Sequence, residues 1–322
     1  MVRLRISISP VPSSEAIIPP IPGLNPEQVW TSREVLEIEE VPKSLTIIGG
    51  GVIGMEFADI FSSLGCECTV VEMLDEILPG IDNDVSVMLR EEFAAKGVTF
   101  NLGCRVTELK GKSVIFEKDG QSQQLDNEEV LVCVGRRPVT GGFGLESLNV
   151  ELDRGGIKID ENCRTNQPNV YAAGDVTGFS LLAHTASREG EVAVNHILGR
   201  TDRMRYNAIP GVVYTHPEVA CVGLTEEGAA EQGIAIQVAK LPMSYAGRFV
   251  AENERKDGFC KVVAGKEYGE ILGVHMIGGH CSEMIYGACM MIESEMRITD
   301  VQEVVFPHPT VSEIIRETIF AF

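Results

Sequence analysis

Three glycines, Gly49, Gly51 and Gly54, stand at the spacing GxGxxG. This spacing suits a bound dinucleotide. The first glycine permits a tight turn, the second lets a pyrophosphate approach the backbone, and the third lets a helix pack against a strand. Val52 and Ile53 would open that helix and present their N–H groups to the phosphates. The alternative is a glycine-rich turn that serves packing alone.

The residues around this motif predict the elements that would position it. The apolar run 45–48 predicts a strand buried on both faces, helical spacing of apolar residues continues to Gly65, and 68–72 predicts the next parallel strand. That strand ends in Glu72, whose carboxylate could accept hydrogen bonds from both hydroxyls of an adenosine ribose. The same charge would repel a 2′-phosphate, so we expect the site to prefer NAD over NADP.

A candidate acid–base pair lies in the last part of the sequence, where His308 is followed by Pro309, Thr310 and, further on, Glu313. Pro309 disfavours helix at His308, and Thr310 could cap a helix that carries Glu313. A carboxylate brought back onto the imidazole would fix its tautomer and raise its basicity, as a general base requires. His216 is also followed by a proline and an acid, so the local pattern alone leaves a structural role open.

Residues 169–175 form a third candidate, in which an apolar stretch runs through small residues to Asp175. The pattern predicts a strand whose end could hold a diphosphate-linked cofactor. A helix expected over 182–198 would aim its N-terminus at the same place. An ordinary turn with a helix-capping aspartate explains these residues equally well.

The order of the elements predicts an α/β chain of more than one domain. A parallel pattern continues to about residue 134, with a hairpin signal around 118–120. From 208 onward, short strands alternate with helices, which predicts an α+β domain with an antiparallel sheet. Prolines predict an extended segment over about 1–25. The segments we expect are 1–42, 43–134, 135–207 and 208–322.

Composition narrows the classes of partner and compartment. The net charge of −20 argues against nucleic acid and anionic membranes as partners. No apolar run is long enough for a membrane span, and the first residues do not form a convincing signal peptide. The nine scattered cysteines favour reduced thiols and a cytoplasmic location. Cys66 and Cys68 are the closest pair, but we expect ordinary core residues there, and no metal site.

Taken together, these stretches resemble the pyridine nucleotide–disulfide oxidoreductases, most closely their dihydrolipoamide dehydrogenase branch. The resemblance extends from about Pro19 to the end, in family order. It rests on these motifs: GGGVIGMEFA, TVVEMLDEILPGID, VLVCVGRRPVT, NVYAAGDVTG with LLAHTASREG, YTHPEVACVGLTEE and HPTVSE. It implies that the four segments are, in order, an extended remnant of an FAD domain with its linker, a Rossmann-like NAD-binding domain, a partial FAD-binding domain and a dimerisation (interface) domain.

The resemblance also implies roles toward NAD. The three glycines of the motif would hold the NAD pyrophosphate, and Glu72 the adenosine ribose. Glu56 occupies the place of a family carboxylate that lies beside the nicotinamide and the flavin. Gly135 would also lie against NAD.

For FAD, the resemblance implies that Asp175 binds the ribityl–phosphate region. The helix beneath the flavin would open at residues Leu182, Ala183 and His184. His308 would be the acid–base that takes a proton from the dithiol substrate, with Glu313 as its orienting partner. In such enzymes this histidine reaches the active site of the neighbouring subunit, which implies a homodimer.

The implied reaction oxidises dihydrolipoamide on the lipoyl-bearing acyltransferase of a 2-oxoacid dehydrogenase or glycine cleavage complex. Electrons pass through a redox disulfide and FAD to NAD. This sequence departs from the family in lacking the first FAD glycine motif and two cysteines separated by four residues. We therefore expect a truncated chain that binds NAD(H) but is inactive alone, because a thiolate is needed for disulfide exchange.

Several alternatives stay open at this point. Within the enzyme class, the rivals are a glutathione reductase-like enzyme and an NADH oxidase or mercuric reductase relative. Glu72 disfavours users of NADP, and the motif around His308 disfavours family members that lack such a base. From a different class, the chain could be a non-catalytic NAD-binding and dimerising module, which the missing cysteine pair favours.

Overall fold

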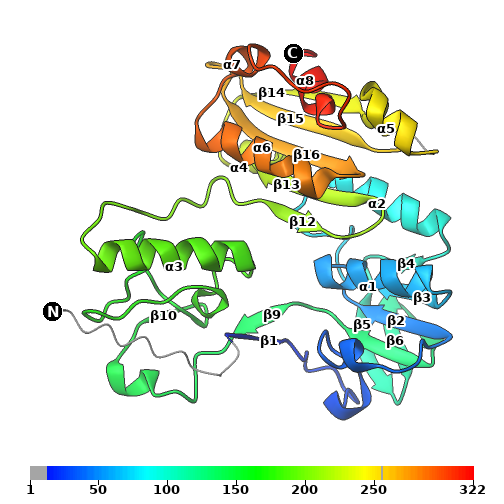
Figure 1. The fold of residues 1–322 in the computed structure, drawn as a ribbon. Coiled ribbons are helices and arrows are strands. Elements are labelled where there is room, and N and C mark those ends of the chain that lie inside the picture. Colours follow the sequence, from blue (N-terminus) through cyan, green and yellow to red (C-terminus); the bar gives the residue numbers. More distant parts are fainter. Residues whose placement is uncertain (1–12, 255–256) are drawn as a thin grey trace. The chain divides into compact units, whose positions relative to one another are not determined.

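The computed structural model describes residues 13–254 and 257–322 (Figure 1). It divides into two compact units. The first joins the residues up to Ile18 with Val134–Tyr206, and the second joins Pro19–Cys133 with Asn207–Phe322. Residues 1–12 of the extended segment expected over about 1–25 lie outside the described residues. The four segment boundaries stay predictions.

The second unit contains a parallel sheet of four strands in the order β4-β3-β2-β8. The elements are β2 (Ser44–Ile48), α1 (Val52–Ser63), β3 (Glu67–Val71), α2 (Asn83–Ala95), β4 (Thr99–Asn101) and β8 (Glu129–Val132). Apart from residues at the edges, β2 and β8 are buried, as expected for strands covered on both faces. The glycine motif lies between β2 and α1, at the carboxyl end of the sheet, where such folds bind ligands.

A separate antiparallel sheet of three strands follows the parallel one in the chain. It consists of β5 (Arg105–Lys110), β6 (Ser113–Lys118) and β7 (Gln121–Asp126). The turn between β6 and β7 has positive φ at Asp119 and Gly120. Two such residues match the twist of an antiparallel pair, which explains the hairpin signal in the sequence.

The C-terminal part of this unit is a five-stranded antiparallel sheet with helices. The strand order is β12-β13-β16-β15-β14. The strands are β12 (Gly211–Val213), β13 (Glu218–Gly223), β14 (Ile236–Pro242), β15 (Phe259–Gly265) and β16 (Ile271–Gly278). The helices are α4 (Glu226–Glu231), α5 (Gly247–Glu252), α6 (Cys281–Glu293), α7 (Ile298–Gln302) and α8 (Glu313–Ile319).

The two faces of this sheet have different neighbours, because side chains alternate along a strand. Val262 and Met276 lie in one core with the apolar residues of α6 and α8. Figure 1 shows α6 crossing β13 and β16. Phe259 and Ile277, on the opposite face, share a core with Phe93 of α2 and other residues of the parallel sheet and its helices. The parallel sheet with its helices and the five-stranded antiparallel sheet therefore share a hydrophobic core.

The first unit has little regular structure. β1 (Ser14–Ala16) pairs with β9 (Arg136–Pro138), and β10 (Leu152–Asp153) pairs with β11 (Gly156–Ile157). Its one long helix among the described residues is α3 (Ala183–Ile197).

The strand expected over 169–175 is wrong, because this segment makes only an isolated bridge between Tyr171 and Arg164. Asn169 and Gly174 have positive φ, which interrupts an extended run, and Asp175 begins a short 3₁₀ helix, Asp175–Thr177.

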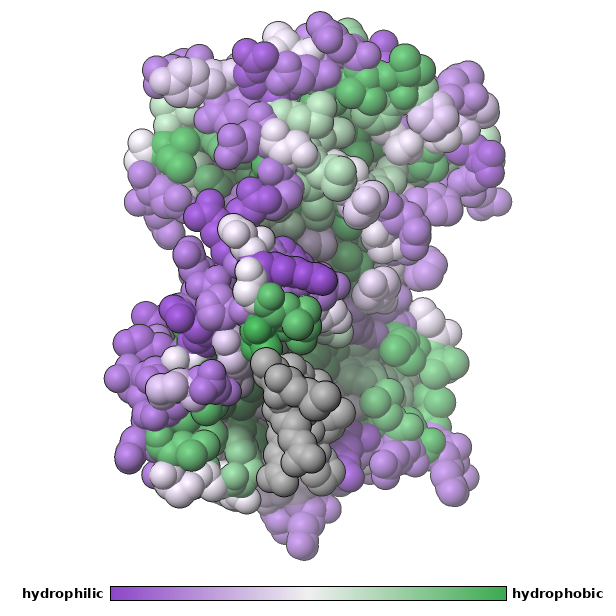
Figure 2. Space-filling model, turned by 60° about the vertical axis from the view of Figure 1, so that its left-hand side comes forward, coloured by the Kyte–Doolittle hydropathy of each residue, from purple (hydrophilic) through white to green (hydrophobic). Residues whose placement is uncertain are grey.

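The surface of the chain is mostly polar on the face that Figure 2 draws. Apolar side chains form separate patches on that face. Within residues 13–254 and 257–322, no helix is both long and apolar enough to cross a membrane. The same residues contain no group of three His, Cys, Asp or Glu side chains that could hold a metal ion.

Candidate functional site

The glycine turn between β2 and α1 has the geometry of a phosphate-binding turn. Gly49 has φ of +108°, which favours glycine. A Cβ on Gly54 would lie 2.2 Å from the carbonyl oxygen of Gly49, so only glycine fits there. A Cβ on Gly51 would meet no atom within 4 Å, so this stretch of backbone is open to a ligand. Val52 and Ile53 open α1, whose first N–H groups lack intrahelical acceptors and carry the positive end of the helix dipole.

The side chain of Glu72 supports this turn through hydrogen bonds. Its carboxylate is buried and accepts hydrogen bonds from the N–H of Gly50 at 2.6 Å and of Leu74 at 2.8 Å. An ionised carboxylate has about four acceptor positions, so two remain for the hydroxyls of a ribose. The sequence pattern did not reveal the bracing bonds, because they depend on where β3 ends beside the turn.

Two carboxylates on α1 hold the loop that follows β12. Glu56 accepts the N–H of Tyr214 at 3.0 Å, and Asp59 accepts the N–H of His216 at 3.0 Å. Lys96 also lies 3.4 Å from Asp59 and donates to the backbone oxygen of His216. The sequence does not predict this role of Asp59, because no local pattern shows that an aspartate in a helix will be buried. Glu56 is thus set by the interface part of the chain, and its role beside a nicotinamide stays a prediction.

His308 and Glu313 form a close pair at the start of α8. The imidazole Nδ1 lies 2.9 and 3.2 Å from the two carboxylate oxygens of Glu313. Since a carboxylate only accepts, Nδ1 donates, which leaves Nε2 of the exposed ring available as a base. The N–H of Thr310 and the ring of His308 lower the pKa of Glu313, in that order of effect.

The helix cap expected at Thr310 is wrong. Helix α8 begins at Glu313, and its N-cap residue is Ser312, which makes no side-chain capping bond. The backbone N–H of Thr310 instead donates to Glu313 at 2.9 Å. The carboxylate therefore holds both the turn and the imidazole.

The second histidine–proline pair differs in this respect. Glu218 does not hold His216 but accepts the N–H of Ser282 at 3.0 Å. A carboxylate oxygen of Asp59 lies 3.8 Å from Nδ1 of His216, beyond hydrogen-bond distance, and the ring is almost fully exposed. Geometry thus separates two motifs that the local pattern could not, and it favours His308 as the base.

Asp175 lies in the first unit at a turn held by residues distant in sequence. Its carboxylate accepts a hydrogen bond from Ser14, whose hydroxyl also accepts one from Arg136 at 2.9 Å. Nearby, the fully buried Glu189 accepts the N–H of Gly174 at 2.6 Å and the hydroxyl of Tyr206 at 2.8 Å. Ser14 and Glu189 carry no sequence signal, because their partners meet them only in the folded unit.

The turn at Asp175 approaches the start of α3. A Cβ on Gly174 would lie 3.2 Å from the Cβ of Ala186. Leu182 is the N-cap residue of α3 and makes no side-chain capping bond, while Ala183 and His184 are exposed in the first turn. A helix N-terminus without a side-chain cap suits a diphosphate group, because its first N–H groups can donate to phosphate oxygens.

Gly135 belongs to the same unit, where it has φ of +113°. Its carbonyl accepts the N–H of Ile17 at 3.0 Å. Its expected place against NAD stays a prediction.

The nine cysteines are all free thiols, and seven of them are buried. Burial raises the pKa of Cys133 and Cys260 to about 12 and of Cys289 to about 11. Cys66 and Cys68 contact one another, and burial raises the pKa of both. A thiol with a raised pKa is a poor nucleophile at neutral pH.

Comparison with known proteins assigns the family. Residues 13–190 match the pyridine nucleotide-disulphide oxidoreductase family, and residues 209–319 match the dimerisation domain of that family. The chain therefore belongs to the pyridine nucleotide-disulphide oxidoreductases, a family of enzymes. This confirms the resemblance found in the sequence and the α/β fold with a C-terminal dimerisation domain.

Relatives of the chain include dihydrolipoyl dehydrogenases from bacteria and animals. The chain is 39% identical to dihydrolipoyl dehydrogenase 3 of Pseudomonas putida, over 92% of its own length and 66% of that protein's. It is 38% identical to the mitochondrial dihydrolipoyl dehydrogenase of Caenorhabditis elegans, over 96% of its length and 64% of that protein's. The chain thus spans about two thirds of the length of these relatives.

Solved structures place the chain among flavoprotein disulfide reductases. LpdA from Mycobacterium tuberculosis superposes with a TM-score of 0.86 at 28% identity, over 96% of this chain and 68% of that one. The HOCl-induced flavoprotein disulfide reductase RclA from Escherichia coli gives the same TM-score, 0.86, at 28% identity, over 96% of this chain and 72% of RclA.

Proposed function

We propose that this chain is the NAD-binding and dimerising part of a dihydrolipoyl dehydrogenase-type flavoenzyme. The observation that carries the proposal is the open backbone at Gly51, beside a turn braced by the buried carboxylate of Glu72. A pyrophosphate would lie on the turn and the first N–H groups of α1, and the adenosine ribose on Glu72. The negative charge of Glu72 would repel a 2′-phosphate on the ribose, which favours NAD(H) over NADP(H).

His308 is the acid–base residue in this proposal. Glu313 holds Nδ1–H, so the free Nε2 can take a proton from a dithiol and return it. The ring of His308 is exposed, so it could reach into the active site of a second copy of the chain. The match of 209–319 to a dimerisation domain supports a homodimer. The protein substrate would be the lipoyl-bearing acyltransferase of a 2-oxoacid dehydrogenase or glycine cleavage complex.

FAD would be held in part by Asp175 and the opening of α3, and it would supply electron transfer between a disulfide and NAD. The chain's own residues there would orient a diphosphate. The FAD site in this chain is incomplete, because the first FAD glycine motif is not in the sequence. We also propose that the chain alone does not turn over lipoamide, because its cysteines lack the redox spacing and carry raised pKa values. The scattered reduced cysteines favour a cytoplasmic location.

Two measurements on the purified chain test the proposal. Titration with NADH and NADPH, followed by nucleotide fluorescence, should give saturable binding of NADH and much weaker binding of NADPH. Equal affinity for both, or no binding, overturns the assignment of Glu72. An assay of lipoamide reduction by NADH should give no sustained turnover, whereas sustained turnover overturns the proposed inactivity.

A visible absorption spectrum of the same sample separates the remaining alternatives. A flavin spectrum supports a flavoenzyme part that still holds FAD through Asp175. A colourless protein that binds NADH favours the second candidate, a non-catalytic NAD-binding and dimerising module, for which the missing cysteine spacing is the specific evidence.

A further inference from the structure

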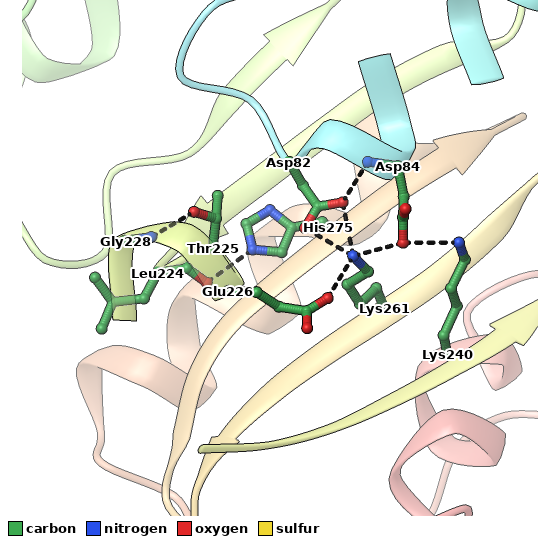
Figure 3. Close-up of polar contacts among 9 residues, drawn as sticks. All are labelled: Asp82, Asp84, Leu224, Thr225, Glu226, Gly228, Lys240, Lys261 and His275. Atoms are coloured by element: carbon green, nitrogen blue, oxygen red, sulfur yellow. Dashed lines mark hydrogen bonds and ion pairs between the residues drawn. The ribbon is translucent and has the colours of Figure 1, made fainter. Parts of the chain in front are cut away.

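A buried lysine links two parts of the second unit. One is the five-stranded antiparallel sheet β12-β13-β16-β15-β14, called here the interface sheet, and the other is the segment beside the glycine turn. Lys261, on β15, is almost completely buried. Its ammonium lies 2.9 Å from both oxygens of Asp82, 2.7 Å from Asp84 and 2.8 Å from Glu226 (Figure 3). Burial alone would lower the pKa of Lys261, but the three carboxylates raise it, so the ammonium stays charged.

These carboxylates come from the first turns of two helices. Asp82 is the N-cap residue of α2 and accepts the N–H of Asp84 at 3.1 Å, and Glu226 is the first residue of α4. Lys240 lies at the edge of the cluster, 2.9 Å from Asp84, with a half-exposed side chain. On the neighbouring strand, His275 stands opposite Lys261 and donates from Nε2 to the carbonyl of Leu224 at 2.8 Å.

A short path of contacts leads from this cluster to the glycine turn. The N–H of Leu78 donates to the carbonyl of Gly50 at 2.9 Å, and the N–H of Ile81 donates to the carbonyl of Leu78 at 3.1 Å. Ile77 packs so closely that a Cβ on Gly50 would lie 3.0 Å from its methyl group. The segment that supports the turn therefore ends at Asp82, the residue that Lys261 holds by both oxygens.

The backbone of the segment 77–82 has a constrained conformation at Leu78. Leu78 is buried and has φ of +53°, a conformation that residues with a side chain rarely adopt. Such a conformation persists only when the surrounding structure holds it in place. On one side it is held by Gly50, and on the other the segment is anchored through Asp82.

We propose that Lys261 is a positioning residue for the nucleotide site: by anchoring Asp82 it sets residues 77–82, and through them the glycine turn at Gly50. The interface sheet thereby determines the geometry of the phosphate-binding turn. The consequence for NADH affinity rests on the proposed function, whereas the consequence for the turn itself does not.

The test uses the full chain with two variants and a matched control. Lys261→Met keeps a long side chain and removes the charge. Asp82→Asn keeps a helix-capping oxygen but removes the negative charge and one of the two oxygens that accept from Lys261. Lys240→Met removes a cation that contacts Asp84 but not Asp82, and serves as the control.

The first readout is hydrogen exchange of the ligand-free chain over residues 45–55 and 73–82, at a temperature where circular dichroism shows each variant folded. Lys261→Met and Asp82→Asn should speed exchange in both segments by about tenfold or more relative to the strands of the interface sheet. Lys240→Met should leave the pattern unchanged. If Lys261→Met does not fold, Asp82→Asn decides the outcome.

The second readout is the dissociation constant of NADH under the same conditions. It should rise about fivefold or more in the two variants and stay unchanged in the control. A uniform rise of exchange across the whole unit with unchanged NADH affinity would mean that Lys261 only stabilises the fold, and would overturn the proposal. If the unaltered chain binds no NADH, the proposed function fails, while the exchange pattern still decides the coupling.

Discussion

The two candidate nucleotide-binding turns use the same chemistry but are assembled differently. In each, a buried glutamate accepts the N–H of a glycine beside the start of a helix, Glu72 with Gly50 and Glu189 with Gly174, both at 2.6 Å. The first turn and the glutamate that holds it lie within residues 44–74, although residues 77–82 also support the turn. The second also requires Ser14, which is far away in the sequence. A local turn is visible in a sequence, and a turn assembled from distant segments is not.

The largest effects should come from the glycines of the first turn. Gly54→Ala places a Cβ 2.2 Å from the backbone oxygen of Gly49, which cannot move aside. We expect the free energy of unfolding to fall by about 3 kcal/mol and NADH binding to be lost. Gly51→Ala meets no atom within 4 Å, so it should leave stability unchanged and still weaken NADH binding. Chemical denaturation and NADH titration measure both. Equal destabilisation by the two variants would contradict the geometry of the turn.

The two buried glutamates provide the next comparison. Glu72→Gln should weaken NADH binding by roughly 1–3 kcal/mol, because the ribose loses its charged acceptor. The bonds to Gly50 and Leu74 are impaired in the same variant, so its hydrogen exchange should rise at the turn. Glu189→Gln is the matched control: it removes the same charge from the other turn and should leave NADH affinity unchanged. An unchanged affinity in Glu72→Gln would mean that adenosine binds elsewhere.

A smaller effect should follow from loosening the second turn. Ser14→Ala removes the hydroxyl between Asp175 and Arg136. We expect a loss of about 1 kcal/mol in local stability, seen as faster hydrogen exchange over residues 172–178. Exchange over residues 45–55 should not change in this variant. If exchange at 172–178 is unaffected, the turn does not depend on distant segments and the contrast between the two turns is wrong.

The smallest effect concerns pH. Burial lowers the pKa of His275, against the opposing bond to the carbonyl of Leu224. The unfolded chain therefore takes up a proton before the folded chain does, so the free energy of unfolding falls as the pH drops below about 6.5. His275→Gln, which keeps a donor for Leu224, should flatten this dependence between pH 7 and pH 5. His216→Gln alters an almost fully exposed ring and should leave it in place. The same slope in both variants would show that other groups cause it.

The sequence predicted those parts whose signals are local. The glycine spacing, the apolar runs beside it and the acid at the end of the second strand lie within a few turns of chain, and the structure has β2, α1 and β3 there. The alternating pattern after residue 208 likewise predicted an antiparallel sheet, which the structure contains. The strand expected over 169–175 failed, because positive φ at Asn169 and Gly174 interrupts it.

Only the tertiary structure decided which polar groups meet. His216 and His308 carry almost the same local pattern, yet only His308 has a carboxylate within hydrogen-bond distance of Nδ1. Lys261 and Asp82 are far apart in the sequence and form a buried ion pair in the fold. The sequence by itself thus determined most of the elements and the position of the glycine turn, because backbone conformation and side-chain periodicity are local properties. The partners of buried charges follow from packing, and packing brings together residues that no spacing rule connects.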